Sequence, residues 1–319
     1  MFKAFVLVRN LESRAGLLDF GEFKISRVGT RFEEFREVFS SFDVDNVDWI
    51  FEKSYLRLPS ALPRSPVDGI PEDIEDILFL LRLYRVGDIA FIRPVIVLPS
   101  GSKSIQAPYR AMNDLNSYSK LTFKIESGDC EPWTIFADRI RASQSWSSDW
   151  FTAARRFFLS GGAKQVDLGR DDVDRIVDYV TALESTLVPE KYSNKRRISN
   201  RAAALIAPDD SVEAESLVRF MKTFYEIRSR ITHGSRIGDR GRAWLRQNFE
   251  QIEDRVRQVL VTAVEGLPPR EDDRRVALAR LYDLTDADRG SFAIDKFKEI
   301  ETPEVRHRVA AEIARLVNR

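Results

Sequence analysis

The sequence predicts an α+β fold: a mixed α/β domain of residues 1–130, an all-α antiparallel helical bundle of residues 131–266, and a helical C-terminal extension of residues 267–319. Three observations support this prediction. Runs of aromatic and β-branched residues, typical of strands, are confined to the first part of the chain. From about Trp133, apolar residues recur at helical spacing instead. The segment Gly266-Leu267-Pro268-Pro269 then stops the last helix of the bundle, because a double proline cannot continue a helix.

In the N-terminal part, strand-like runs alternate with two helix-like segments. Five segments have the composition of strands: Phe2–Val8, Phe20–Val28, Trp49–Leu58, Ile89–Leu98 and Ser119–Ile125. The Glu-rich segment Phe32–Phe39 and the segment Asp73–Tyr84 are predicted to be helical. Proline, serine and glycine predict loops at Leu62–Pro66 and Pro99–Gly101.

The second part contains six helical segments with short connections, which is the pattern of an antiparallel bundle. These segments are Trp133–Ala142, Ser148–Ser160, Asp171–Val188, Asn194–Ala207, Val212–His233 and Arg242–Glu265. Beyond the double proline, Arg270–Leu281 and Pro303–Val317 are predicted to be helices of the extension.

The composition argues against several kinds of site. Lys+Arg and Asp+Glu number 50 each, so no global basic charge indicates a nucleic-acid binder, although a locally basic cleft stays possible. Cys130 is the only cysteine, and His233 and His307 are the only histidines. We therefore expect no disulfide, no metal site and no cofactor. Of the two histidines, His307 is expected to be a surface residue.

No apolar run approaches the roughly 20 residues that span a bilayer. The apolar run at the N-terminus is also too short for a signal peptide. The sequence therefore predicts a cytoplasmic protein that does not insert into a membrane.

The segment Val212–His233 carries the clearest helix signals. Asp210 with Glu213 three residues later resembles a capping box, and Gly234 is a plausible stop. Its apolar residues form one stripe at helical spacing: Leu217, Phe220, Met221, Phe224, Ile227 and Ile231.

Three of the predicted apolar stripes each contain one charged residue. Arg228 lies in the stripe of Val212–His233, Glu184 in that of Asp171–Val188, and Arg201 in that of Asn194–Ala207. A charge on a core-facing stripe is costly unless it is paired. We therefore hypothesise that Glu184 pairs with Arg228 or Arg201 where the helices meet. The alternative is that each long side chain extends from the edge of its stripe to water.

A motif at the end of Val212–His233 resembles the R-x4-6-H signature of HEPN domains. It consists of Arg228, four intervening residues, His233 and Gly234, with Phe224–Ile227 before it and the polar Ser229 directly after the arginine. Upstream, the segments Trp150–Gly161, Tyr179–Leu187 and Arg196–Ala202 are similar to the ApeA-like branch of that group. The resemblance covers roughly Trp133 to Gly266.

The resemblance implies a helical bundle that dimerises and a metal-independent ribonuclease used in antiviral or abortive-infection defence. It also implies that Arg228 and His233 are catalytic. The imidazole could accept the proton of a ribose 2′-hydroxyl or protonate the leaving 5′-oxygen. The guanidinium could stabilise charge on the phosphoryl oxygens. Attack by the 2′-hydroxyl would leave a 2′,3′-cyclic phosphate and restrict the enzyme to RNA. Ser229 and Glu184 are expected to support the pair.

The spacing of the motif raises a geometric problem. Five residues on an ideal helix place Arg228 and His233 about 140° apart, so the two side chains would not meet at one phosphate. Either the helix unwinds just before Gly234, or a two-fold homodimer brings Arg228 of one chain towards His233 of the other.

Basic residues near the motif could bind the phosphates of RNA. The candidates are Arg196, Arg197, Arg201, Arg230 and Arg236, with Lys191, Lys195, Arg240 and Arg242 near them in the sequence. For the group around Arg196, an ordinary solvated helix face is an equally good interpretation.

The N-terminal part has no phosphate-binding glycine loop, nucleophile elbow or metal-ligand spacing. By resemblance, it could sense a protein or ligand trigger, or restrain the nuclease. Two rival functions stay open for the chain: a non-catalytic HEPN module that binds RNA or a partner protein, and a purely structural dimerisation bundle.

Overall fold

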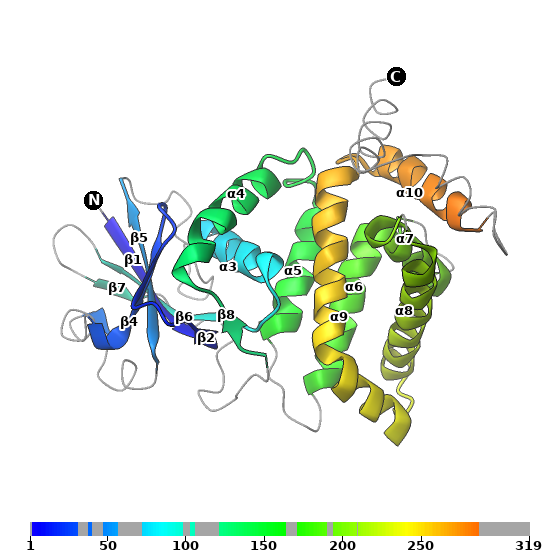
Figure 1. Cartoon of the computed structure of the whole chain (residues 1–319), viewed down its shortest axis with the longest axis horizontal. Coiled ribbons are helices and arrows are strands. Elements are labelled where there is room, and N and C mark those ends of the chain that lie inside the picture. Colours follow the sequence, from blue (N-terminus) through cyan, green and yellow to red (C-terminus); the bar gives the residue numbers. More distant parts are fainter. Residues whose placement is uncertain are drawn as a thin grey trace. The chain divides into compact units, whose positions relative to one another are not determined.

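The computed structural model describes residues 2–30, 38–39, 47–56, 72–97, 103–105, 121–163, 171–189, 194–208 and 210–286. The chain forms two compact units, one of Met1–Asp138 with Gln165–Asp167 and one of Arg139–Lys164 with Leu168–Arg319. The fold is α+β, as predicted. The strands lie in the N-terminal part, and the described residues beyond them are mostly helical (Figure 1).

The first unit is built on a six-stranded antiparallel sheet of order β3-β4-β5-β1-β6-β7. Its strands are β1 (Phe2–Arg9), β3 (Leu17–Asp19), β4 (Lys24–Arg27), β5 (Trp49–Tyr55), β6 (Ala90–Val97) and β7 (Lys103–Ile105). The short strands β2 (Leu11–Glu12) and β8 (Phe123–Lys124) form a separate parallel pair. Helix α3 (Glu72–Tyr84) lies between β5 and β6 in the chain.

The centre of this sheet is buried on both faces: successive side chains of a strand point to opposite faces, and Ala4–Val8 of β1 are all buried. On one face, Phe5 and Leu7 of β1 pack with Ile50 of β5 and Val95 of β6. Phe51, the neighbour of Ile50, instead contacts the rings of Phe23 and Phe91, with 5.0 Å between ring centroids in each case. Each of the five predicted strands overlaps a strand of the structure, namely β1, β4, β5, β6 or β8. The predicted helix Asp73–Tyr84 is confirmed as α3.

The sequence did not predict β2, β3 and β7, because strands of two or three residues are too short to show alternation. The predicted helix Phe32–Phe39 lies almost entirely outside the described residues, as do the predicted loops Leu62–Pro66 and Pro99–Gly101.

The second unit is helical. It contains the end of α4 (Cys130–Arg141) and the helices α5 (Asp149–Ala163), α6 (Asp171–Leu187), α7 (Asn194–Ile206), α8 (Ser211–Thr232), α9 (Asp239–Gly266) and α10 (Glu271–Asp286). All six helices predicted between Trp133 and Glu265 are confirmed within three residues of their expected bounds. Helix α6 packs against α5, α7, α8 and α9 (Figure 1). It is therefore buried around most of its circumference.

Helix α10 packs against α7, and its residues Leu278 and Leu281 are buried. Arg274 of α10 donates to the carbonyl oxygens of Ser185 and Thr186 at the C-terminal end of α6. Arg201 of α7 donates to the next carbonyl, that of Leu187, at 2.6 Å. The last carbonyls of a helix have no partner within it. Two guanidinium groups therefore satisfy the end of α6.

A buried ionic contact joins α6 to α9. Arg175 and Glu253 are both 0% exposed, and Nη2 of Arg175 lies 3.7 Å from Oε2 of Glu253. The hydroxyl of Tyr179 donates to the same carboxylate oxygen at 2.8 Å. Helix α5 can approach Tyr179 closely because residue 161 is glycine; a Cβ there would lie 2.7 Å from the tyrosine ring. The sequence did not predict this contact.

None of the described helices combines the length and the apolar character needed to span a membrane. The predicted helix Pro303–Val317 and His307 lie outside the described residues.

Candidate functional site

Helix α8 is specified at its start and along its buried face. The side chain of Asp210 accepts hydrogen bonds from the N–H groups of Val212 and Glu213, both at 2.9 Å, which confirms the predicted N-cap. Oε1 of Glu213 lies 3.3 Å from Nη1 of Arg255 on α9. The predicted apolar stripe is buried at Leu217, Met221, Phe224 and Ile227. These contacts therefore determine which face of α8 is buried and which face is exposed.

The C-terminal end of α8 places His233 at the surface. Gly234 has φ +69°, which glycine adopts at little cost. Its N–H donates to the carbonyl of Ile231 at 3.1 Å, and that of Ser235 donates to the carbonyl of Arg230 at 2.9 Å. These two bonds form a Schellman motif, which confirms Gly234 as the helix stop.

The backbone leading into His233 stays helical. The N–H of His233 donates to the carbonyl of Ser229 at 3.1 Å, as in a regular helical turn. The helix therefore does not unwind before Gly234, and this way of bringing Arg228 and His233 together within one chain is excluded. His233 itself is exposed, and its imidazole forms no hydrogen bond to any described residue.

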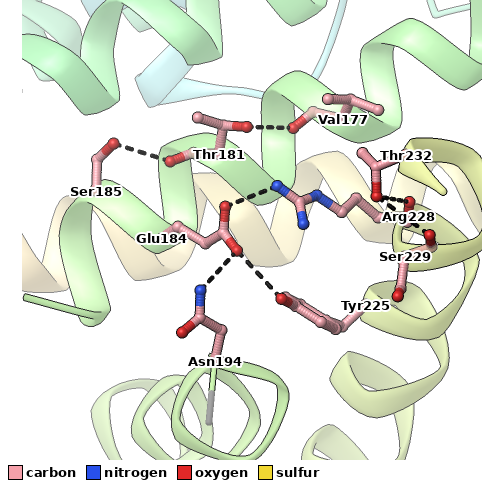
Figure 2. Close-up of polar contacts among 9 residues, drawn as sticks. All are labelled: Val177, Thr181, Glu184, Ser185, Asn194, Tyr225, Arg228, Ser229 and Thr232. Atoms are coloured by element: carbon pink, nitrogen blue, oxygen red, sulfur yellow. Dashed lines mark hydrogen bonds and ion pairs between the residues drawn. The ribbon is translucent and has the colours of Figure 1, made fainter. Parts of the chain in front are cut away.

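Glu184 of α6 is the centre of a polar cluster that connects three helices (Figure 2). Its Oε2 accepts from Nη2 of Arg228 on α8 at 2.9 Å. Its Oε1 accepts from the hydroxyl of Tyr225 on α8 at 3.2 Å and from Nδ2 of Asn194 on α7 at 3.0 Å. The hypothesis of a Glu184 ion pair is therefore confirmed, and the partner is Arg228. We call Glu184, Asn194, Tyr225 and Arg228 the Glu184 cluster.

The environment of the Glu184 cluster keeps Tyr225 protonated. Burial raises the pKa of the Tyr225 phenol, and the negative charge of Glu184 raises it further. The phenol therefore stays a hydrogen-bond donor to the carboxylate. The guanidinium of Arg228 lies 5.7 Å from the centroid of the Tyr225 ring, which restricts its orientation further.

Arg228 retains hydrogen-bonding capacity beyond its ion pair. Within the described part of the chain, Glu184 is the only acceptor that its guanidinium contacts, through one of five N–H groups. The Arg228 side chain is 20% exposed and that of Glu184 is 18% exposed. The Nε of Arg228 is buried, so a phosphoryl oxygen could bind only the remaining Nη N–H groups while Glu184 still holds the side chain.

The other candidate residues differ in their availability. Ser229 is half-buried, and its hydroxyl forms no hydrogen bond to a described residue. Arg230, Arg236 and Arg196 are exposed, whereas Arg197 is half-buried. Lys191 lies outside the described residues.

Arg201 requires a correction. It is 1% exposed, and its guanidinium donates to the carbonyls of Leu187 and Leu278. A buried guanidinium cannot reach a backbone phosphate, so the predicted RNA-binding role of Arg201 is contradicted.

Within one chain, the catalytic candidates do not meet. Arg228 extends from α8 towards α6 (Figure 2), whereas His233 caps the helix end and contacts no member of the Glu184 cluster.

Sequence reasoning missed two members of the Glu184 cluster, Tyr225 and Asn194. The position of Tyr225, three residues before Arg228 on one helical face, could have indicated its contact. Asn194 carried no such signal.

No group of three His, Cys, Asp or Glu side chains suited to a metal ion occurs among the described residues.

Comparison of the chain with protein-family models, with curated proteins and with solved structures found no match in any of the three. The resemblance to HEPN domains therefore stays a prediction that rests on this chain's own residues.

The Glu184–Arg228 pair should couple α6 to α8 measurably. Removing either partner leaves a largely buried charge or acceptor unsatisfied, so Glu184→Gln should lower the free energy of unfolding by about 1–2 kcal/mol. A double-mutant cycle with Arg228→Gln should give a coupling energy of about 1–2 kcal/mol by chemical denaturation. The Lys195–Glu226 pair between α7 and α8 is a matched control. Its side chains are 45% and 53% exposed, so its coupling should be smaller. Equal coupling in the two pairs would contradict this assignment.

Proposed function

We propose that this protein is a metal-independent RNA endonuclease of the HEPN type, which acts as a homodimer in antiviral or abortive-infection defence. In this proposal, Arg228 of one protomer and His233 of its partner act on the same phosphodiester. The observation that carries it is the end of α8. A half-buried carboxylate fixes Arg228 while leaving Nη N–H groups free, and a Schellman motif fixes the backbone at the exposed His233 one turn later.

The proposed chemistry needs only these two side chains, water and the RNA. The 2′-hydroxyl attacks the adjacent phosphorus, the bond to the 5′-oxygen breaks, and a 2′,3′-cyclic phosphate and a 5′-hydroxyl result. His233 accepts the 2′-hydroxyl proton or donates a proton to the leaving 5′-oxygen, and water supplies or takes up the other proton. Arg228 donates to the phosphoryl oxygens as negative charge accumulates on them. Ser229, one residue beyond Arg228, provides a further hydroxyl for the phosphate.

Glu184 has a positioning role in this proposal. Long arginine side chains adopt many rotamers in solution, and ordering them costs free energy. The carboxylate of Glu184 accepts hydrogen bonds from Tyr225 and Asn194. It orders the Arg228 side chain before RNA binds, so RNA binding does not incur this entropic cost. Preorganised charge of this kind is what stabilises a transition state most effectively.

One observation favours the alternative of a non-catalytic HEPN module that binds RNA or a partner protein. Glu184 already neutralises Arg228 within the chain, so the pair can act as a purely structural connection between α6 and α8. In a binding module, neither Arg228 nor His233 would be needed to break a bond.

The two functions are separated by incubating the protein with RNA of mixed sequence in the presence of EDTA. We expect wild-type protein to release products that end in a 2′,3′-cyclic phosphate, and the Arg228→Ala and His233→Ala variants to release none. Binding of RNA by all three proteins without cleavage would support the module and overturn the nuclease.

A further inference from the structure

Five arginines gather around the connection between α8 and α9. They are Arg230, Arg236, Arg240, Arg242 and Arg246, and we call them the arginine strip. Only one acidic residue, Asp239, occurs between Arg230 and Arg246. This segment therefore carries a formal charge of +4 within a chain whose formal net charge is +0. All five arginines are exposed.

The arginines of the strip form no ion pair with any carboxylate that the structure describes. Neither Asp239, which lies between them, nor Glu250, one turn after Arg246, binds one of them. The one hydrogen bond that their side chains make to a described residue runs from Nε of Arg242 to the carbonyl of Ile237, at 3.3 Å.

Arginines elsewhere in the second unit behave differently. Many of them contact an acidic residue, including exposed ones such as Arg219 with Glu215 and Arg275 with Glu271. Arg228, Arg255 and Arg257 are also paired. The strip is therefore a local exception rather than the general condition of arginine in this protein.

A cluster of unpaired like charges disfavours the folded chain through mutual repulsion. The same cluster attracts a polyanion, and each phosphate that it neutralises releases condensed counterions. The strip is thus better explained by an anionic partner than by the stability of the protein alone.

We propose that the arginine strip binds the sugar-phosphate backbone of RNA and holds the strand across His233. This proposal rests on the function proposed above, because it names the surface that delivers the substrate to that site. His233 lies in the sequence between Arg230 and Arg236, so arginines of the strip flank the histidine on both sides. Arg240 and Arg246 are separated by about 9 Å along the axis of α9. The small residue Ala243 lies between them on the exposed face of the helix.

The strip replaces part of the predicted RNA-binding set. It keeps Arg230 and Arg236, omits the buried Arg201, and adds Arg240, Arg242 and Arg246 of α9. Because arginine contacts to phosphate carry no sequence information, the strip sets the path of the strand and not its sequence.

The test measures binding of a fluorescein-labelled, single-stranded 2′-O-methyl RNA by fluorescence anisotropy, between about 50 and 200 mM salt. Blocking the 2′-hydroxyl prevents the proposed cleavage, so binding is observed alone. For single strands, each phosphate contact contributes about 0.7 to the slope of log affinity against log salt concentration. The double variant Arg240→Gln/Arg246→Gln should therefore lower this slope by about 1.4 in magnitude.

The matched control is Arg219→Gln/Arg275→Gln, which removes the same charge from exposed arginines that already have acidic partners. Its slope should equal that of the wild type. Equal slopes for wild type and strip variant, or an equal loss in the control, would overturn the strip. A wild type that binds through the strip but leaves natural RNA intact would overturn the nuclease alone. Cleavage by wild type with unchanged binding in the strip variant would overturn the strip alone.

Discussion

His233→Ala should abolish RNA cleavage while the folded protein stays almost as stable as the wild type. A positioned general acid or base contributes about 10²- to 10⁴-fold to a reaction rate, and alanine removes it entirely. The stability should hardly change, because the imidazole is exposed and forms no hydrogen bond to a described residue. The end of α8 is fixed by backbone bonds at Gly234 and Ser235, which do not involve that side chain.

Two measurements on the same variant test this prediction: the cleavage rate in EDTA and the chemical denaturation midpoint. Thr232→Ala is the matched control, since it changes the neighbouring exposed residue but leaves His233 in place. Cleavage by His233→Ala at the wild-type rate would exclude the imidazole from the chemistry. Loss of cleavage in Thr232→Ala to the same extent would show that the helix end, and not the imidazole, is what matters.

Glu253→Gln should lower the free energy of unfolding by about 3–5 kcal/mol, the usual cost of removing one charge from a buried ion pair. Arg175 would then be a fully buried cation facing a neutral amide. Tyr179, which donates to Glu253 at 2.8 Å, would lose its charged acceptor as well. Denaturation monitored by circular dichroism measures the loss directly.

The same site offers a control that separates charge from packing. In the triple variant Arg175→Met/Tyr179→Phe/Glu253→Met, all three polar groups are replaced by apolar ones of similar size. Such replacements of buried ion pairs are often neutral or stabilising. The triple variant should therefore recover most of the stability that Glu253→Gln loses. If the triple variant is less stable than Glu253→Gln, packing rather than the removal of one charge of the pair accounts for the effect.

The sequence predicted the helices well because their signals are local. The Asp210 cap, the stripe from Leu217 to Ile227 and the stop at Gly234 each act within a few residues of the chain. The order of the strands could not be predicted in this way, since β1 pairs with β5 and β6, which follow it at a distance in the chain. Pairing at long range leaves no periodic pattern in the sequence.

The same limit applies to the polar residues of the helical unit. Glu184 and Arg228 were identified because each is a charge on an apolar stripe, and the structure pairs them. Arg201 gave the same signal but binds the end of α6, and the sequence does not distinguish a carboxylate partner from a helix end. Arg175 gave no signal, because it lies off the predicted stripe. Only the packing of α6 against four neighbouring helices buries that second face.

A complementation measurement tests most directly whether Arg228 and His233 of different protomers form one site. Arg228→Ala and His233→Ala proteins, each inactive alone, are unfolded, mixed in equal amounts and refolded, so that half of the dimers contain one chain of each kind. In a two-fold dimer with two composite sites, each mixed dimer has one site with both side chains intact. The mixture should then cleave RNA in EDTA at about a quarter of the wild-type rate. A mixture as inactive as either variant alone, with mixed dimers verified to be present, would contradict the composite site.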